Sequence, residues 1–202
     1  MKVSNPIHKA MLSRIRRKPN WVFSATDFRD LGSRAAVDKA LSRLAATDSI
    51  RRIIRGLFYV PQQHPVVGLT SPDVEQVAKK LVERSGVRLQ PTGAYAANAL
   101  GLCEQVPAKV VFLTDGPSRH IRIGRLDIKL RHTSPRMLAT SFELSGLIIQ
   151  ALRYLGKRHV DQNMVRHLAR RLPAPARKKL LKDVAYAPEW IGDIMRQLAA
   201  SE

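Results

Sequence analysis

The chain has 202 residues, one cysteine and a large excess of positive charge, with 35 Lys and Arg against 16 Asp and Glu, a formal net charge of +19. A single cysteine excludes an intramolecular disulfide, and apolar runs of only a few residues exclude a membrane-spanning segment. The N-terminal residues contain no apolar signal core, so we expect a cytoplasmic protein. An excess of this size favours a polyanionic partner, most simply nucleic acid.

The positive charge is densest at the start of the chain. Residues 1–60 hold thirteen basic and four acidic side chains, a net +9, whereas residues 61–138 and 139–202 each hold eleven and six, a net +5. Prolines and polar residues over 61–72 interrupt the periodic patterns and predict a domain boundary there.

The first segment predicts a helix that ends at Pro19. Its apolar residues recur at helical spacing, and they are Ile7, Met11 and Ile15. The β-prone run 21–23 follows, and it predicts a short strand.

A second, short helix is predicted after this strand. Ser24 and Asp27 have the spacing of a capping box. Phe28 and Leu31 form its buried side, and Gly32 ends it.

A third helix is predicted over 33–46, with Ser33 as its N-cap. Its inner stripe has the spacing i, i+3, i+4 and i+7, and it consists of Val37, Ala40, Leu41 and Leu44. The polar residues left on the outside are Arg34, Asp38, Lys39, Ser42 and Arg43.

A basic hairpin is predicted directly after the third helix. The β-prone runs 50–54 and 57–60 flank a turn that contains Arg55 and Gly56. This order of elements predicts a winged helix-turn-helix in which 33–46 is the recognition helix in the major groove and 50–60 is the wing.

Side-chain chemistry assigns a role to each residue of the expected DNA surface. We expect Arg34 and Lys39 to contact base edges, Ser33 and the neighbouring amides to bind a phosphate, and Arg43 to contact the backbone. Asp38 is expected to pair with Arg34 in the free protein.

Arg51, Arg52 and Arg55 of the wing are expected to reach phosphates or an adjacent minor groove, and Thr26 is a further phosphate candidate. The alternative interpretation is a solvated basic face on a module that binds only protein.

The middle of the chain predicts a small α/β domain over 70–136. Helices are predicted at 73–84 and 92–102, and strands at 87–89 and 109–114. The runs 119–123 and 126–131 flank Gly124 and Arg125 and predict a second hairpin.

The remainder, 137–202, predicts a helical C-terminal region packed on the α/β domain, with helices at 142–155, 160–172, 176–186 and 188–198. The predicted fold class is therefore α+β: a winged helix-turn-helix over 1–61, an α/β domain with a mixed sheet over 70–136, and a helical tail.

Two segments resemble the AbiE-type antitoxin family of type IV toxin–antitoxin systems. One is residues 33–61, which ends in Arg-Gly-Leu-Phe-Tyr-Val-Pro. The other is residues 93–102, followed by Pro-Ala-Lys-Val-Val-Phe-Leu-Thr at 107–114 and the hairpin 119–131.

The resemblance implies an N-terminal domain that binds operator repeats in double-stranded DNA and represses its own operon. It also implies a C-terminal domain that counters a nucleotidyltransferase-like toxin, directly or through a shared target. No antitoxin residue can be assigned from it. Dimer formation on operator repeats is expected.

No constellation typical of an enzyme is present, so we expect no catalytic residues, no metal and no cofactor. There is no phosphate-binding loop, no CxxC pair and no HxH or HxxxH pair, and Cys103 is interpreted as a small buried residue. Asp115 and Asp127 are the strongest enzymatic candidates, as a carboxylate pair for Mg²⁺ in a nuclease or nucleotidyltransferase. An RNA-binding antitoxin is the other alternative.

Overall fold

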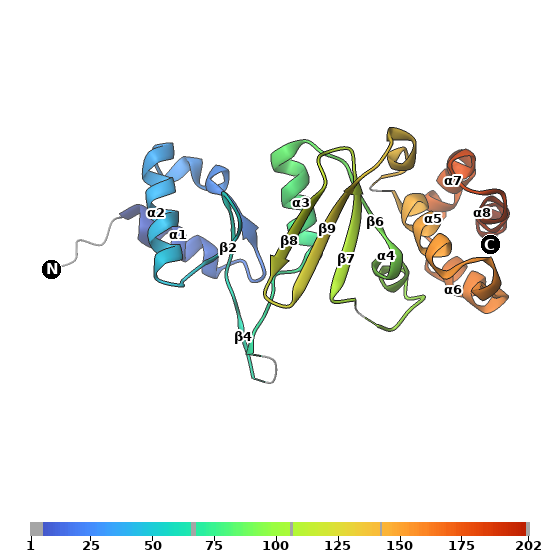
Figure 1. Cartoon of the computed structure of the whole chain (residues 1–202), viewed down its shortest axis with the longest axis horizontal. Coiled ribbons are helices and arrows are strands. Elements are labelled where there is room, and N and C mark those ends of the chain that lie inside the picture. Colours follow the sequence, from blue (N-terminus) through green and yellow to red (C-terminus); the bar gives the residue numbers. More distant parts are fainter. Residues whose placement is uncertain (1–5, 66–67, 106, 142, 201–202) are drawn as a thin grey trace. The chain divides into compact units, whose positions relative to one another are not determined.

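Helices and strands are mixed in the first two thirds of the chain and helices follow in the remainder (Figure 1), and the computed structural model describes residues 6–65, 68–105, 107–141 and 143–200. The first elements are α1 (Pro6–Arg16), β1 (Val22–Phe23), the 3₁₀ helix η1 (Ala25–Leu31), α2 (Arg34–Ala46), β2 (Arg51–Ile54), β3 (Leu57–Tyr59), β4 (Gln63–His64), β5 (Gly68–Leu69) and α3 (Val74–Ser85). The others are β6 (Leu89–Thr92), α4 (Gly93–Ala99), β7 (Lys109–Thr114), β8 (Arg119–Ile123), β9 (Leu126–His132), η2 (Pro135–Leu138), α5 (Leu144–Leu155), η3 (Lys157–His159), α6 (Gln162–Arg171), α7 (Ala174–Asp183), η4 (Val184–Tyr186) and α8 (Glu189–Ala200).

The described residues group into two compact units. The first unit comprises Met1–Ser85 and Ile121–Leu126, and the second comprises Gly86–His120 and Asp127–Glu202. This division differs from the predicted ranges 1–61 and 70–136, because α3 belongs to the first unit. The physical reason is a set of polar contacts from α3 to the N-terminal elements, described below.

The core of the first unit lies between its helices and one face of a small sheet. The buried side chains come from α1, η1, α2 and the strands, and they include Met11, Phe23, Phe28, Val37, Leu41, Leu44, Ile50 and Phe58. The aromatic rings of Phe23 and Phe28 meet edge to face with centroids 5.7 Å apart, a favourable arrangement. The predicted inner stripes of the first and third helices are confirmed.

The predicted second helix forms as a 3₁₀ helix. Its backbone departs from helical angles at Phe28 (φ −128°, ψ 21°), so the segment is two short turns joined at a kink. The predicted capping box is confirmed, since the Asp27 carboxylate accepts a hydrogen bond of 2.8 Å from the Ser24 backbone N–H.

The predicted hairpin is confirmed as β2 and β3, with β1 added on the other side of β3. The strand order is β1-β3-β2, and both pairs are antiparallel. Gly56 occupies the turn with φ +76°, a conformation that favours glycine. Leu57 and Tyr59 alternate with Phe58 and are also buried, so this sheet has protein on both faces.

The predicted boundary region 61–72 contains one feature that the sequence did not indicate. Strands β4 and β5 pair antiparallel through Gln63↔Leu69 and His64↔Gly68. Each strand has only two residues, too few for a hydrophobic alternation to mark it.

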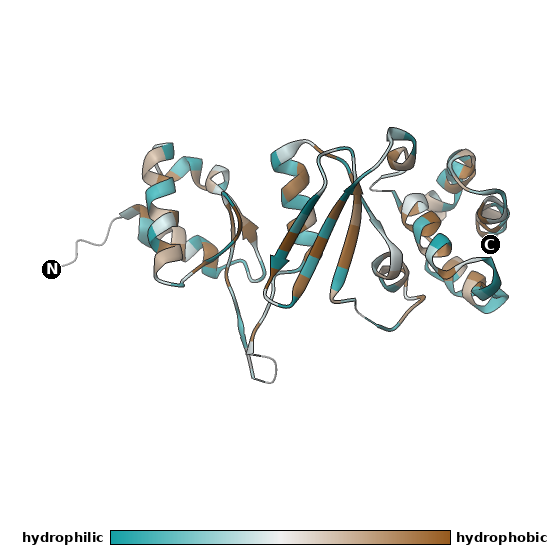
Figure 2. Ribbon diagram, viewed as in Figure 1, coloured by the Kyte–Doolittle hydropathy of each residue, from teal (hydrophilic) through white to brown (hydrophobic). Residues whose placement is uncertain are grey.

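The predicted mixed sheet is present, and its strands β6 and β7 and most of β9 belong to the second unit. The strand order is β6-β7-β9-β8, with β6 antiparallel and β9 parallel to β7. Hydrophobic and hydrophilic residues alternate along β9 (Figure 2), and Ile128 and Leu130 are buried whereas Lys129 and Arg131 are exposed. The strand predicted at 87–89 forms later, as β6, and pairs along its whole length with β7.

Helices fill the rest of the second unit, as predicted for the C-terminal region. Helices α4, α5, α6, α7 and α8 share one hydrophobic core, which includes Ala96, Ile148, Leu152, Leu168, Leu180, Ile191 and Met195. Tyr95 of α4 also packs on Phe112 of the sheet, with ring centroids 5.9 Å apart. The C-terminal helices are therefore part of the same body as α4 and the strand it covers.

The helix ends differ from the predictions by a few residues. The helix predicted over 142–155 is α5, whose first described residue is Leu144, and residue 142 lies outside the described residues. The helix predicted over 176–186 begins earlier and ends in the 3₁₀ turn η4. Within the described part of the chain, no helix has the length and apolar character needed to cross a bilayer.

Gly146 in α5 gives a test of this packing. Ala has a helix propensity about 1 kcal/mol better than Gly. A Cβ at Gly146, however, would overlap the Thr140 carbonyl oxygen and lie 2.5 Å from Gln90 Oε1. We therefore expect Gly146→Ala to lower the free energy of unfolding by about 2 kcal/mol, measured by urea denaturation.

Gly192→Ala in α8 is the matched control. Its Cβ would meet two side-chain atoms, Val184 Cγ1 at 3.1 Å and Arg196 Nη1 at 3.8 Å, and no backbone atom within 4 Å. Equal stability of the two variants would contradict the packing described for α5.

Candidate nucleic-acid interface

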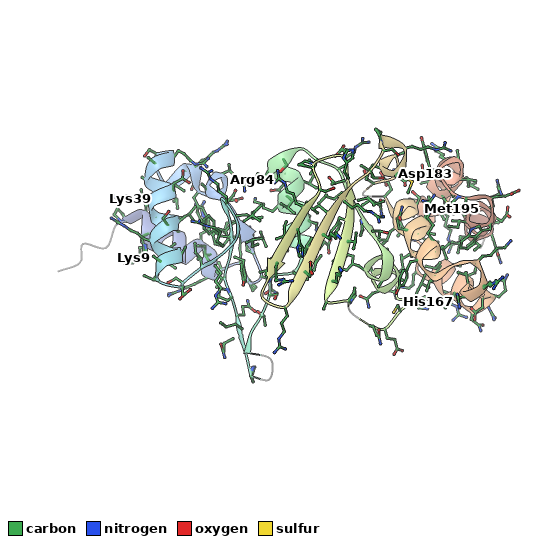
Figure 3. The ribbon with its side chains drawn as sticks, viewed as in Figure 1. Lys9, Lys39, Arg84, His167, Asp183 and Met195 are labelled. Carbon is green, nitrogen blue, oxygen red and sulfur yellow. The ribbon has the colours of Figure 1, made fainter. Side chains whose placement is uncertain are left out.

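Helix α2 has one buried and one exposed face, and the exposed face carries the predicted recognition residues. Arg34, Lys39 and Arg43 are all exposed, opposite the buried stripe that includes Leu41 and Leu44. Lys39 is labelled on α2 in Figure 3. The structure thus brings these three cations onto the exposed surface of one helix.

The middle of the exposed face carries three small side chains and one lysine. At about 100° per residue, Ala35, Lys39, Ser42 and Ala46 point away from the core, and all four are exposed. Arg34 lies on one flank of this line and Arg43 on the other. The exposed face of α2 thus presents one lysine among small side chains at its centre, with an arginine on either side.

Ser33 is the N-cap of α2, as predicted. Its Oγ accepts from the Ala36 N–H at 3.3 Å. The hydroxyl retains its own proton as a donor, so capping and donation to a phosphate oxygen are compatible. The amide groups at this end also carry the positive end of the helix dipole.

The predicted pairing of Arg34 with Asp38 is present. Arg34 Nε lies 2.9 Å from Asp38 Oδ2, and the two side chains are 65% and 51% exposed. An exposed i, i+4 pair of this kind contributes only about 0.3–0.5 kcal/mol. Arg34 can therefore leave Asp38 for a stronger anionic partner at little cost.

The β2–β3 hairpin presents the predicted arginines on the surface. Arg51, Arg52 and Arg55 are exposed. The Arg52 guanidinium carbon lies 5.4 Å from the centroid of the Phe58 ring, its cross-strand partner. This cation–π contact orients Arg52 without neutralising it.

Arg84 of α3 is a residue of this surface that sequence analysis missed. Its Nη1 donates to the Arg55 carbonyl oxygen at the hairpin turn, and its guanidinium would lie 3.3 Å from a Cβ at Gly56. Figure 3 labels Arg84 on α3. The contact spans 29 positions of sequence, so no local pattern could have indicated it.

Thr26 lies at the start of η1, where it was predicted to meet a phosphate. Its side chain is exposed, and its Oγ1 is 2.6 Å from Ser24 Oγ. The structure therefore gives Thr26 a local partner, at a position separate from the exposed face of α2.

Asp27 joins η1 to α3 in the first unit. Lys80 Nζ lies 2.6 Å from Asp27 Oδ1 and 2.8 Å from Glu83 Oε2. Desolvation by burial lowers the pKa of Lys80, but the hydrogen bonds from these two carboxylates outweigh it and raise the pKa above its ordinary value. Lys80 therefore stays protonated, and it holds α3 on the N-terminal helices.

The two candidate metal carboxylates do not come together. Asp127 is level with Lys109 at the start of β7, whereas Asp115 follows Thr114 at its end. Six strand steps separate the two levels, about 20 Å at 3.3 Å per residue. The alternative of an Asp115–Asp127 pair for Mg²⁺ is therefore not supported, because parallel pairing of β9 with β7 places the two carboxylates at opposite ends of the strands.

Both carboxylates have other partners. Asp115 accepts from the backbone N–H and from Nε of Arg88, each at 2.8 Å. Asp127 Oδ1 lies 2.5 Å from His120 Nε2. Among the described residues, no group of three or more His, Cys, Asp or Glu could hold a metal ion, and Cys103 is partly buried beside the helical core rather than fully enclosed.

Comparison with known families gives one match that covers most of the chain. The model of a family described as "Family of unknown function (DUF6088)" matches residues 10–180. The chain therefore belongs to the DUF6088 family.

Two further comparisons add little. No curated protein matches the chain. The crystal structure of the Rv2827c protein from Mycobacterium tuberculosis is similar with a TM-score of 0.45 and 14% sequence identity, over 98% of this chain and 77% of that chain.

The Arg88–Asp115 pair predicts a pH-dependent stability. The side-chain hydrogen bond from Arg88, followed by its backbone N–H, lowers the pKa of Asp115 below its ordinary value of 3.8. The pair therefore stabilises the fold above pH 3.8, and this contribution is lost as the pH falls through the lower, folded-state pKa.

We expect Asp115→Asn to unfold at a lower urea concentration than the wild type at neutral pH, with a difference that shrinks on acidification below pH 3.8. Asp193→Asn, which removes a carboxylate from an exposed pair with Arg196, is the control and should change little. A constant difference at all pH values would show that the charge of Asp115 is not involved.

Proposed function

We propose that this member of the DUF6088 family is a DNA-binding transcriptional autoregulator. Its first unit would act as a winged helix-turn-helix, with α2 as the recognition helix in the major groove and the β2–β3 hairpin as the wing. The operator would be double-stranded DNA near its own reading frame.

One observation carries this proposal, the exposed face of α2. Ala35, Ser42 and Ala46 keep the centre of this face low except at Lys39, and Arg34 and Arg43 lie on its two flanks, so the face combines little bulk with three cations. The arginine flanks match the bidentate recognition of guanine and the contacts to phosphate that the major groove offers.

The position of α2 in the chain supports the same function. It follows α1 and η1 and leads directly to β2, since the N–H groups of Ser49 and Ile50 both donate to the Leu44 carbonyl oxygen. The basic hairpin therefore begins beside the last turn of α2. Helices in this order followed by a basic hairpin are the arrangement of winged DNA-binding modules.

The charge distribution agrees with a duplex partner. Residues 1–60 carry thirteen basic and four acidic side chains. The pair formed by Arg34 and Asp38 is weak enough to open on binding, so the protein would exchange a solvated ion pair for a contact with DNA.

The antitoxin role, a nucleotidyltransferase-like toxin as partner and a homodimer remain predictions that rest on the resemblance of 33–61 and 93–131 to AbiE-type antitoxins. Growth rescue on co-expression with a toxin encoded beside this chain would test them. RNA binding stays the alternative, and structured RNA serves as a competitor in the experiment below.

Fluorescence anisotropy with the DNA upstream of the reading frame, compared with a shuffled duplex, tests the proposal directly. We expect a preference of tenfold or more at near-physiological salt, about 1.4 kcal/mol. Equal affinities that fall together with salt would contradict sequence recognition, and tighter binding of structured RNA would favour the alternative.

Substitutions distinguish sequence-specific recognition of DNA from general electrostatic attraction to it. We expect Arg34→Ala to reduce the preference for the upstream duplex by about 1–3 kcal/mol. Arg55→Ala should weaken binding to both duplexes alike and reduce the slope of log affinity against log salt concentration by about one. Lys157→Ala in η3 removes the same charge from the second unit and is the control. If all three variants behave alike, the surface of α2 has no special role.

A further inference from the structure

The first unit contains a pocket that the proposed DNA surface does not use. It has a volume of about 530 Å³ and lies between α1, the turn that follows it and η1. Its lining residues are Ala10, Ser13, Arg14, Arg17, Lys18, Trp21, Asp27 and Leu31. This volume is within the range of small-molecule sites, roughly 300–1,000 Å³.

The pocket combines a cationic rim with an apolar wall. Arg14, Arg17 and Lys18 are set against a single acidic residue, Asp27. The carboxylate of Asp27 already accepts from Lys80 and from the Ser24 N–H, so it is not available to neutralise the rim. The net charge of the pocket favours an anion.

The cations of the rim differ in how firmly they are held. Arg14 donates to both carboxylate oxygens of Asp30 and to the Asp27 carbonyl oxygen, so it belongs to the wall. Among the described residues, Arg17 forms neither a hydrogen bond nor an ion pair through its side chain, and it is exposed. Lys18 is also exposed. These two cations are free to engage a ligand.

Trp21 supplies a planar surface beside the free cations. Lys18 Nζ lies 4.5 Å from the centroid of the Trp21 ring, while Phe23 and Phe28 pack on the indole from the interior, at 5.1 and 5.6 Å. The indole thus packs against the aromatic core and is contacted by the exposed ammonium group of Lys18. An anion that draws Lys18 aside would leave an aromatic face for a planar ring.

The backbone fixes this arrangement. Helix α1 ends at Arg16, Pro19 follows, and Asn20 turns the chain with φ +58°. Asn is among the residues that tolerate this left-handed conformation. The tight turn returns the chain so that Trp21 lies under the side chain of Lys18.

We propose that this pocket binds a mononucleotide, with its phosphate on Arg17 and Lys18 and its base between Trp21 and Leu31. The apolar wall argues against a duplex backbone as the occupant, since a phosphodiester would need only exposed cations. A free nucleotide uses both halves of the pocket, through charge-assisted hydrogen bonds and stacking. The inference does not depend on DNA binding by α2.

Tryptophan fluorescence tests the proposal. In the full chain with Trp190→Phe, Trp21 is the sole tryptophan. Adenosine and guanosine 5′-monophosphates should quench it saturably with a dissociation constant below a millimolar, and inorganic phosphate and adenosine should each bind at least about tenfold more weakly.

The double variant Arg17→Ala/Lys18→Ala should lose at least about tenfold in nucleotide affinity. Lys157→Ala/Arg158→Ala, which removes two charges from η3, should keep it. Calorimetry on the chain with both tryptophans checks that Trp190→Phe has not altered the fold. Duplex affinity is measured in parallel, so a failure of either proposal is seen separately.

Three outcomes would overturn the proposal. The first is no saturable quenching by any nucleotide. The second is inorganic phosphate binding as tightly as nucleotides, which would reduce the pocket to an anion site. The third is a double variant that loses duplex affinity without any nucleotide binding in the parent, which would assign the cations to the DNA backbone.

Discussion

Asp27 connects η1 with α3 through its carboxylate and with α1 through its backbone carbonyl oxygen. One oxygen accepts from the Ser24 N–H, the other accepts from Lys80 of α3, and the carbonyl oxygen of the same residue accepts from Arg14 of α1. Buried polar groups are tolerated only when such partners are complete. Removing this carboxylate would leave the protonated Lys80 with Glu83 alone and free the first turn of η1. Asp27 thus adds polar links to α3 and α1 to the hydrophobic packing that holds η1 beside α2.

Helix α3 holds the turn of the β2–β3 hairpin in place. A free-standing hairpin would be a flexible extension, but here β3 is buried on both faces and the turn at Arg55 is held by Arg84. The arginines of β2 therefore project from a rigid base. Rigid cations lose less conformational entropy on binding than cations on a loose loop. The same contacts explain why α3 belongs to the first unit.

Features of the structure that depend on interactions between nearby residues were predicted from local sequence patterns. The stripe of Val37, Ala40, Leu41 and Leu44, the Ser33 cap and the pairing of Arg34 with Asp38 all lie within a few positions of one another. The mixed sheet and the helical C-terminal region were also predicted. Contacts over long separations were not: Lys80 with Asp27, Arg84 with the hairpin turn, and the register that parts Asp115 from Asp127 depend on tertiary packing. The pocket beside Trp21 depends on the turn at Asn20, and the amino-acid composition does not determine the geometry of that turn.

The small residues on the exposed face of α2 lie on the surface proposed to bind DNA and take no part in the core that holds the helix in place. Ala35, Ser42 and Ala46 contribute nothing to the buried stripe of the helix, so their replacement by larger or polar side chains would leave the core intact. Surface changes of this kind usually alter stability by less than about 0.5 kcal/mol. The helix can consequently change what it touches while its own architecture stays fixed. If α2 binds DNA as proposed, descendants of one ancestral chain could diverge in binding preference through these positions, with no compensating mutation elsewhere in the fold.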